Sequence, residues 1–288
     1  MKIQLPKYAT TYLKIALSLA CLWYALTKPN WGELVQAGEQ VSPAWVLVAL
    51  GAYTLSKVLA SRRLNINFEL IGLPLTERAN RRLFWLGMLY NLLLPGAITG
   101  DAYKVMVLGK SPGLSRRSLT LAVLLDRFSG LLSLLLILAI LYAWVLPPSW
   151  VTFSGLIGAG LLIPFSQQLL KKLLPQQAKG FNRTFWLGAG VQLLVVLTVF
   201  SLILSMNLTT NSLKYMLVFL SAAALSVLPI SIGGGLGIRE FASIQGAQWI
   251  GLPIEKALMI SLLFYGVTLL TALPGALYIF RDPLTESK

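Results

Sequence analysis

Three groups of charged residues lie inside long apolar stretches of the sequence. They are Asp101 with Lys104, Asp126 with Arg127, and Arg239 with Glu240. A charge within a membrane segment costs about 2.5–3.5 kcal/mol on insertion scales, so each group is a candidate for function. The guanidinium groups of Arg127 and Arg239 match phosphate oxygens and could recognise a lipid phosphate. Asp101, Asp126 or Glu240 could balance those charges, receive an amine headgroup or take up a proton.

A structural role is the alternative for the same residues. The charges at 126–127 and 239–240 could pair and lock helices together, because intramembrane charges are normally paired. The two interpretations are compatible. The sequence has one cysteine, Cys21, and no histidine. These counts exclude disulfides, Cys/His metal sites and histidine acid–base catalysis. We expect no metal and no cofactor.

The composition indicates a membrane protein. Hydrophobic residues make up 56% of the 288 residues and charged residues only 12%, against roughly 25% charged residues in soluble domains. Apolar runs close to the ~20 residues that cross a bilayer recur along the chain. We therefore expect one membrane domain over 1–288. The net charge of +14 lies in segments that flank the apolar runs, as the positive-inside rule requires. Nucleic-acid binding is not supported.

Two apolar runs end in proline and glycine. Run 83–98 contains Pro95 and Gly96 and leads to Gly100, and run 213–228 leads to Pro229, Gly233, Gly234, Gly235 and Gly237. Proline removes a backbone donor and glycine permits unusual dihedrals, so the chain can turn at both places. Helices that open after Gly100 and Gly235 would add anion-binding N–H groups. The glycine run lacks the Gly-Lys-Ser/Thr ending of a nucleotide loop, so no ATP-driven mechanism is predicted.

A re-entrant hairpin explains the first break. A full crossing at 83–98 would put the basic residues of 104–117 outside, whereas a turn at 95–100 returns the chain through 101–110 to the cytoplasm. Non-helical backbone is tolerated at membrane depth where protein buries it or where it lines a wet cavity. Segment 213–250 is predicted as a second hairpin that enters from outside.

The predicted fold is an all-α integral membrane protein with six transmembrane helices and two oppositely oriented re-entrant helical hairpins. The crossings are expected at about 12–27, 43–60, 118–146, 150–165, 184–206 and 256–280. Segment 28–42 is predicted as an outer loop. Segment 61–82, with Arg62 and Arg63, is predicted as a cytoplasmic loop. This topology places both termini in the cytoplasm and most of the basic residues on that side.

The two breaks also suggest an internal repeat. The separation of Pro95 from Gly100 equals that of Pro229 from Gly234. Each half, 1–146 and 147–288, then consists of two helices, a hairpin and a helix, and the halves are inverted in the membrane. Inverted repeats with broken helices are common in secondary transporters. Alternatively, proline and glycine simply recur in an apolar chain.

Several motifs resemble those of the lysylphosphatidylglycerol synthase transmembrane-region family, which includes the flippase domain of the multiple peptide resistance factor proteins. The motifs are Asn91 with Leu94-Pro95-Gly96, Gly100-Asp101-Ala102-Tyr103-Lys104, Asp126-Arg127, Pro229 through Glu240, and Leu273-Pro274-Gly275. Lys104 stands where the family pattern suggests arginine. The resemblance implies lipid translocation. The aminoacyl-transferase domain of the fused proteins has no counterpart here, so a separate lipid synthase would have to supply a lysyl-lipid.

The leading hypothesis is a lipid flippase or scramblase of a bacterial or archaeal cytoplasmic membrane. A phospholipid, polyprenyl-phosphate or glycolipid headgroup would pass through a polar cavity between the hairpins. The candidate substrate-binding residues are Asp101, Tyr103, Lys104, Asp126, Arg127, Arg239 and Glu240. A secondary transporter of a small solute or ion is the main alternative. A lipid-modifying enzyme is disfavoured because the carboxylates are few and dispersed, and an assembly partner without transport activity stays open.

Overall fold

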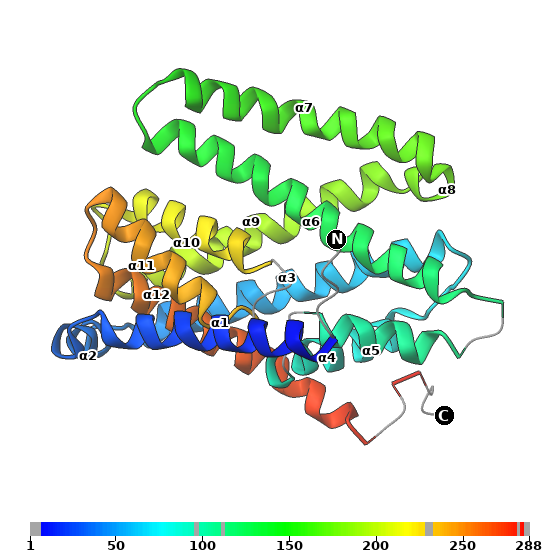
Figure 1. The fold of residues 1–288 in the computed structure, drawn as a ribbon, viewed down its shortest axis with the longest axis horizontal. Coiled ribbons are helices and arrows are strands. Elements are labelled where there is room, and N and C mark those ends of the chain that lie inside the picture. The colour runs from blue at the N-terminus through cyan, green and yellow to red at the C-terminus, as the bar shows by residue number, and fades with distance from the viewer. Residues whose placement is uncertain (1–6, 95–97, 111–112, 228–232, 281–282, 285–288) are drawn as a thin grey trace.

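A computed structural model describes residues 7–94, 98–110, 113–227, 233–280 and 283–284. These residues form twelve α-helices and one short 3₁₀ helix (Figure 1). The elements are α1 (Lys7–Thr27), α2 (Trp31–Glu39), α3 (Pro43–Glu69), α4 (Glu77–Leu93), α5 (Thr99–Leu108), α6 (Arg116–Val145), α7 (Trp150–Leu173), α8 (Pro175–Ala178), α9 (Phe181–Ser205), α10 (Ser212–Ser226), α11 (Ile238–Ile250), α12 (Ile254–Ala272) and η1 (Leu273–Tyr278). The predicted turn residues Pro95, Gly96 and Pro229 lie outside the described ranges.

Five helical segments are long and apolar enough to cross a membrane. They are α3, α6, Thr152–Leu173 in α7, α9, and Ile254–Tyr278, which joins α12 to η1. These segments match five of the six predicted crossings. The sixth crossing was expected in α1, where only the shorter stretch Ser18–Thr27 counts as apolar among the residues searched. The chain is a multi-pass, all-α membrane protein.

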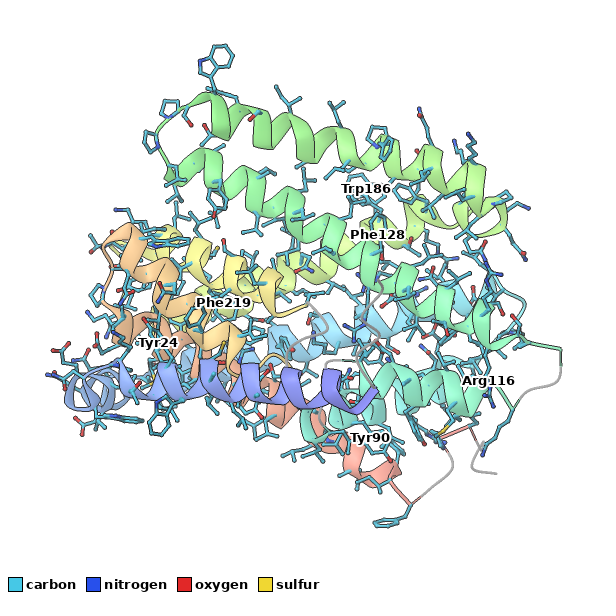
Figure 2. The ribbon with its side chains drawn as sticks, viewed as in Figure 1. Tyr24, Tyr90, Arg116, Phe128, Trp186 and Phe219 are labelled. Carbon is cyan, nitrogen blue, oxygen red and sulfur yellow. The ribbon has the colours of Figure 1, made fainter. Side chains whose placement is uncertain are left out.

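The long helices lie side by side and define two ends of the molecule (Figure 1). The α6–α7 and α11–α12 connections and the short helix α2 gather at one end. The α3–α4, α5–α6 and α7–α9 connections gather at the other. The second end, which we call the basic end, carries Arg78, Arg81, Arg116, Lys171 and Lys172; Arg116 is labelled there in Figure 2. The two sets of loops that the sequence assigns to opposite sides therefore lie at opposite ends.

The centre of the structure is the packing of α3 along α9, which is the most extensive helix contact in the described part of the chain. Ala49 and Tyr53 of α3 belong to the same buried cluster as Val199 and Leu202 of α9. By contrast, α7 lies at the edge (Figure 1) and packs mainly against α6 and α8. Much of its apolar surface is exposed, as expected for a helix that faces lipid.

Helices α4 and α5 lie on either side of the first predicted break, and we call such helices a broken pair. The two helices approach very closely at Gly87 and Gly100. A Cβ atom on Gly100 would overlap the backbone carbonyl of Gly87. Gly100 is the second residue of α5, and it is absent from the residues with positive φ. The expectation that Gly100 supplies an unusual turn conformation is wrong. Glycine is needed there because it lets α5 contact the backbone of α4.

The second broken pair is α10 with α11. Gly233, Gly234, Gly235 and Gly237 have φ values of 55°, 71°, 104° and 87°, so this predicted break does use backbone conformations that favour glycine. The two breaks also meet, since a Cβ atom on Gly234 would lie 2.6 Å from Cδ2 of Leu92 in α4. The end of α4 is therefore adjacent to the connection between α10 and α11, although the two lie far apart in the sequence.

Two predicted loops contain helix instead. Segment 28–42 contains α2, whose first turn is capped by the Asn30 side chain, which accepts a hydrogen bond from the backbone N–H of Gly32. Leu34 and Ala37 on one face of α2 are buried. Segment 61–82 was predicted as a loop from its charges, but α3 continues to Glu69. Its polar residues find partners in the protein interior, as described below, so the helix need not end at Ser61.

The close approach of α4 and α5 gives a test of the fold. We expect Gly100→Ala to destabilise the protein by at least about 2 kcal/mol, because the new methyl group has no space beside the Gly87 carbonyl. Gly51→Ala in α3 is the matched control, since nothing lies within 4 Å of a Cβ atom there. Chemical unfolding in detergent measures both variants. Equal stabilities of the two variants would contradict the contact.

Candidate functional site

The first group of charges is centred on the carboxylate of Asp101 in the first turn of α5. Lys104 Nζ lies 2.9 Å from Asp101 Oδ1, and Arg127 Nε of α6 contacts Asp101 Oδ2. One carboxylate therefore accepts hydrogen bonds from two cations on two helices. The sum of the three charges is +1. Of the three side chains, those of Asp101 and Lys104 are buried, whereas that of Arg127 is 30% exposed.

The end of α4 holds the first turn of α5 in place. The backbone N–H of Gly100 donates to Asn91 Oδ1 at 2.8 Å, and Thr99 Oγ1 donates to the carbonyl of Tyr90 at 3.1 Å. The ring of Tyr103 packs edge-on against Tyr90. The N–H groups that follow Gly100 were predicted to be available for an anion. Those of Asp101 and Ala102 instead donate to the carbonyl of Ile98 at 3.1 Å and 2.9 Å. Asp101 instead provides the negative charge that a helix N-terminus favours.

Lys104 points back toward α4 rather than toward solvent. Its Nζ lies 4.8 Å from the ring centroid of Phe84, and its Cε would be 2.6 Å from a Cβ atom on Gly87. The absence of a side chain at Gly87 therefore makes room for the lysine. A cation between a carboxylate and an aromatic face is doubly stabilised when it is desolvated. We conclude that Lys104 fixes the orientation of Asp101.

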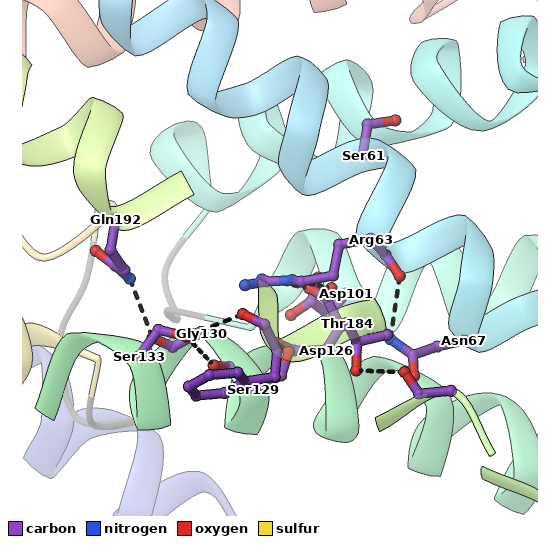
Figure 3. Close-up of polar contacts among 12 residues, drawn as sticks. Ser61, Arg63, Asn67, Asp101, Asp126, Ser129, Gly130, Ser133, Thr184 and Gln192 are labelled. Atoms are coloured by element: carbon purple, nitrogen blue, oxygen red, sulfur yellow. Dashed lines mark hydrogen bonds and ion pairs between the residues drawn. The ribbon is translucent and has the colours of Figure 1, made fainter. Parts of the chain in front are cut away.

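Asp126, which precedes Arg127 in α6, has a different partner. Arg63 of α3 donates two hydrogen bonds to it, from Nε to Oδ1 at 2.7 Å and from Nη2 to Oδ2 at 3.1 Å (Figure 3). Both residues are buried. The sequence prediction assigned Arg63 to a cytoplasmic loop, and this assignment was wrong because α3 extends past it. Neighbouring charges at 126 and 127 thus connect α6 to two different helices.

Two glycines create the space for the Arg63 guanidinium. Cβ atoms on Gly130 of α6 and Gly188 of α9 would lie 2.9 Å and 3.2 Å from Arg63 Nη1. Nη1 itself is buried without a hydrogen-bond partner among the described residues. Ser129 and Ser133 are on the same part of α6 (Figure 3), and Ser133 Oγ donates to the carbonyl of Ser129 at 3.0 Å. The ion pair therefore joins α3 and α6 next to α9.

A sequence signal for Arg63 does exist. Ser56, Ala60, Arg63 and Asn67 have the i, i+4, i+7, i+11 spacing of one helix face, and all four are buried. Small and polar residues on one face are typical of helix contacts within membranes. A second buried polar residue contacts α3 here: Asn80 Nδ2 of α4 donates to the carbonyl of Ser61 at 2.7 Å. The continuation of this face past Ser61 predicts a longer α3.

The second group of charges is enclosed between α11 and α12. Arg239 Nη2 lies 3.0 Å from Glu240 Oε1, Arg239 Nε donates to Ser261 Oγ at 2.9 Å, and Ser261 Oγ donates to Glu240 Oε1 at 2.8 Å. The guanidinium also lies within 6.0 Å of the ring centroids of Phe219, Phe264 and Tyr265. Arg239 and Glu240 are 3% and 1% exposed. This neutral pair stabilises the packing of α10, α11 and α12.

Glu240 also caps its own helix. Its Oε2 accepts a hydrogen bond from the backbone N–H of Gly237 at 2.7 Å. The N-terminus of α11 was predicted to attract an anion. The carboxylate of Glu240 already accepts a hydrogen bond there. Substrate contact by Arg239 or Glu240 stays a prediction, and the geometry brings these two residues together with Ser261 rather than with Arg127.

A groove of about 470 Å³ lies between α5 and α6, beside the first group of charges. Its lining residues are Ile98, Asp101, Ala102, Val105, Met106, Arg116, Thr120, Val123, Leu124 and Arg127. Met106 and Leu124 are about half exposed, so the groove opens on the outer surface of the helices. The sequence predicted a polar cavity between the two hairpins. The observed groove begins at the first break, near Ile98, and follows α6 instead.

An arginine of α6 lies at each end of the groove. Arg116 lies in the first turn, at the basic end of the molecule, and Arg127 follows on the same helix face. Their separation along the helix axis is about 16 Å (11 residues at 1.5 Å each). Between them Thr120, Val123 and Leu124 line the groove. A mostly apolar groove thus connects an exposed arginine to a partly buried one.

The comparison with known protein families decides the assignment. The family model for the Lysylphosphatidylglycerol synthase TM region matches residues 12–275. The chain belongs to this family. The match confirms the resemblance seen in the sequence, and it covers both groups of charges, the groove and Gly275 of η1. No curated protein matches the chain. A family named for the membrane region of a lipid-modifying protein links the chain to membrane lipids.

The Arg63–Asp126 pair gives a second test. We expect Asp126→Ala to cost about 3–5 kcal/mol of stability, because it leaves the Arg63 charge buried without its partner. The double variant Arg63→Met/Asp126→Leu removes both charges with similar volume, and it should recover most of that loss. Unfolding in detergent compares the three proteins. A double variant as unstable as Asp126→Ala would show that the two residues do not depend on each other.

Proposed function

We propose that the chain is a lipid flippase or scramblase that moves the headgroup of a phosphate-bearing lipid along the groove between α5 and α6. The observation that carries the proposal is the combination of an outward-open apolar groove with a partly exposed Arg127 at its inner end. The acyl chains would stay outside the groove, against exposed apolar residues such as Met106 and Leu124. The family match to a lipid-linked membrane region supports the same class of cargo.

Charge balance explains why a phosphate would bind at this place. Asp101, Lys104 and Arg127 together carry a charge of +1, so a phosphodiester of charge −1 would neutralise the group. Arg127 Nε donates to Asp101, and its guanidinium is partly exposed beside the groove. The planar guanidinium matches the geometry of phosphate oxygens. Electrostatic attraction is stronger in a low-dielectric site than in water. A lipid headgroup at Arg127 would therefore be stabilised at a depth that is otherwise unfavourable to charge.

The arrangement of helices supports a path for the headgroup. In the proposed topology, α4/α5 and α10/α11 are re-entrant hairpins that enter from opposite sides, and the basic end faces the cytoplasm. The halves 1–146 and 147–288 form an inverted repeat in which α3 and α9 occupy equivalent places. Arg116 would receive the headgroup at the cytoplasmic interface and Arg127 would hold it near mid-depth. Broken helices that meet in the membrane serve this purpose in other transporters.

The groove favours lipid over the alternative cargo. A small solute or an ion needs a pocket that is closed to lipid, whereas this groove opens sideways on the apolar surface. The proposed activity involves no chemical catalysis, and any energy coupling would come from ions, the membrane potential or the lipid gradient. Lysylphosphatidylglycerol could be the cargo only with a separate synthase. The proposal therefore names the class of lipids with an anionic phosphate rather than one lipid.

Leaflet exchange in proteoliposomes tests the proposal. Fluorescent phosphatidylglycerol is reconstituted with the protein, and dithionite bleaches only the outer leaflet. We expect Arg127→Gln to slow the exchange at least tenfold, because the inner end of the groove loses its cation. Arg117→Gln is the matched control, since Arg117 is an exposed arginine next to Arg116 that does not line the groove.

A second variant tests the path independently of charge. Leu124→Trp adds bulk at an exposed position in the groove wall, so it should block exchange without disturbing the core. Wild-type rates in both Arg127→Gln and Leu124→Trp would refute the path. Failure of the wild-type protein to exchange any anionic or polyprenyl lipid would refute the transport function itself.

A further inference from the structure

A second cavity lies at the basic end of the molecule, between α4 and η1. Its volume is about 280 Å³, and it is lined by Arg78, Arg81, Arg82, Trp85, Pro274 and Tyr278. It shares no lining residue with the groove between α5 and α6. The four α4 residues have the i, i+3, i+4, i+7 spacing that places them on one helix face. Side chains from two distant parts of the sequence thus converge on one small site.

The positions of the arginines are electrostatically unfavourable for the isolated protein. Arg78, Arg81 and Arg82 lie in the first two turns of α4, where the helix dipole disfavours cations. Arg78 and Arg81 form no ion pair with any residue that the structure describes. The nearby Glu77 contacts α3 instead, since its Oε1 accepts a hydrogen bond from Asn65 Nδ2 at 3.2 Å. The exposed guanidinium groups of Arg78 and Arg81 near this helix N-terminus therefore favour binding of an anion.

The cavity is held in shape by contacts that do not involve a ligand. Trp85 Nε1 donates to the carbonyl of Thr271 at 2.9 Å, and a Cβ atom on Gly275 would overlap the carbonyl of Trp85. The Arg82 guanidinium lies 5.9 Å from the ring centroid of Tyr278. Arg81 Nε donates to the carbonyl of Glu77 at 3.2 Å. Arginines that serve only as topology signals need no such preorganised cavity.

The surroundings indicate which kind of anion fits. Leu273, Leu277 and Phe280 belong to the same segment as the cavity residues Pro274 and Tyr278. Leu277 and Phe280 are 67% and 96% exposed. Such a surface suits acyl chains, and the adjoining Trp85 and Tyr278 are residue types that favour the membrane interface. A basic cavity next to an exposed apolar strip has the shape of a phospholipid, with the phosphate at one end and the chains at the other.

We propose that this cavity binds the phosphate of an anionic phospholipid at the membrane interface of the basic end. The acyl chains of this lipid lie along η1. The site is separate from the transport path and does not depend on the proposed function. Bound lipid neutralises the arginines at the N-terminus of α4 and thereby stabilises the attachment of η1 to α4.

Photocrosslinking in proteoliposomes tests the site. The probe is phosphatidylglycerol with a photoactivatable group in one acyl chain, and peptide mass spectrometry locates the products. We expect labelling within Leu273–Phe280. Arg78→Ala/Arg81→Ala should weaken the apparent affinity for the probe roughly 25-fold, or about fivefold for each arginine. Lys171→Ala/Lys172→Ala removes the same charge from the last turn of α7 and should leave the affinity within about twofold of the wild type.

Three results would overturn the site. The first is equal labelling by a phosphatidylcholine probe, which would indicate ordinary contact of η1 with lipid. The second is wild-type affinity in the Arg78→Ala/Arg81→Ala variant. The third is displacement of the probe by millimolar inorganic phosphate, which would indicate a site for free phosphate. Arg127→Gln should keep the labelling even if it loses leaflet exchange, so failure of this site and failure of the transport proposal are distinguishable.

Discussion

The structure depends on the requirement that every charge buried among these helices has a partner of opposite sign. Within a bilayer the hydrophobic effect does not draw helices together, since lipid tails are as apolar as leucine. Specific polar contacts then decide which helices meet. Arg63 with Asp126 joins α3 to α6, and Arg127 with Asp101 joins α6 to α5. Helix α6 carries both contacts on consecutive residues, so it positions the broken α4/α5 pair relative to the central α3 and α9.

Glycine makes these charge contacts possible. Gly87 and Gly100 let α5 approach α4 so closely that Lys104 reaches both Asp101 and the ring of Phe84. Gly130 and Gly188 leave space for the Arg63 guanidinium in the same way. Small residues at helix contacts are expected in membranes, because packing and interhelical hydrogen bonds replace the missing hydrophobic driving force. Here the small residues and the charges act together, since the gaps at Gly87, Gly130 and Gly188 each accommodate a cationic side chain.

The sequence predicted the long apolar helices and the charged positions much better than the partners of those charges. Pairing of Asp126 was one of two compatible interpretations, but its partner Arg63 was assigned to a loop. A rule that treats basic residues near helix ends as topology signals cannot distinguish a buried arginine from an exposed one. Helix α2 was missed since only nine residues form it. The glycines of the second break have positive φ values, which their residue type favours, whereas Gly100 is required for a tertiary contact that no local pattern contains.

The two groups of charges differ in net charge and in exposure, so one suits a structural role and the other suits binding. Arg239 and Glu240 form a neutral, enclosed pair, and a phosphate could reach Arg239 only if the arginine left a partner that is itself buried. Removing one member of a buried pair costs several kcal/mol, so a single phosphate contact gives little net gain there. The group around Asp101 has one positive charge in excess, and its Arg127 borders an open groove. This difference in net charge and exposure makes the group around Asp101 the more favourable of the two for an anionic headgroup.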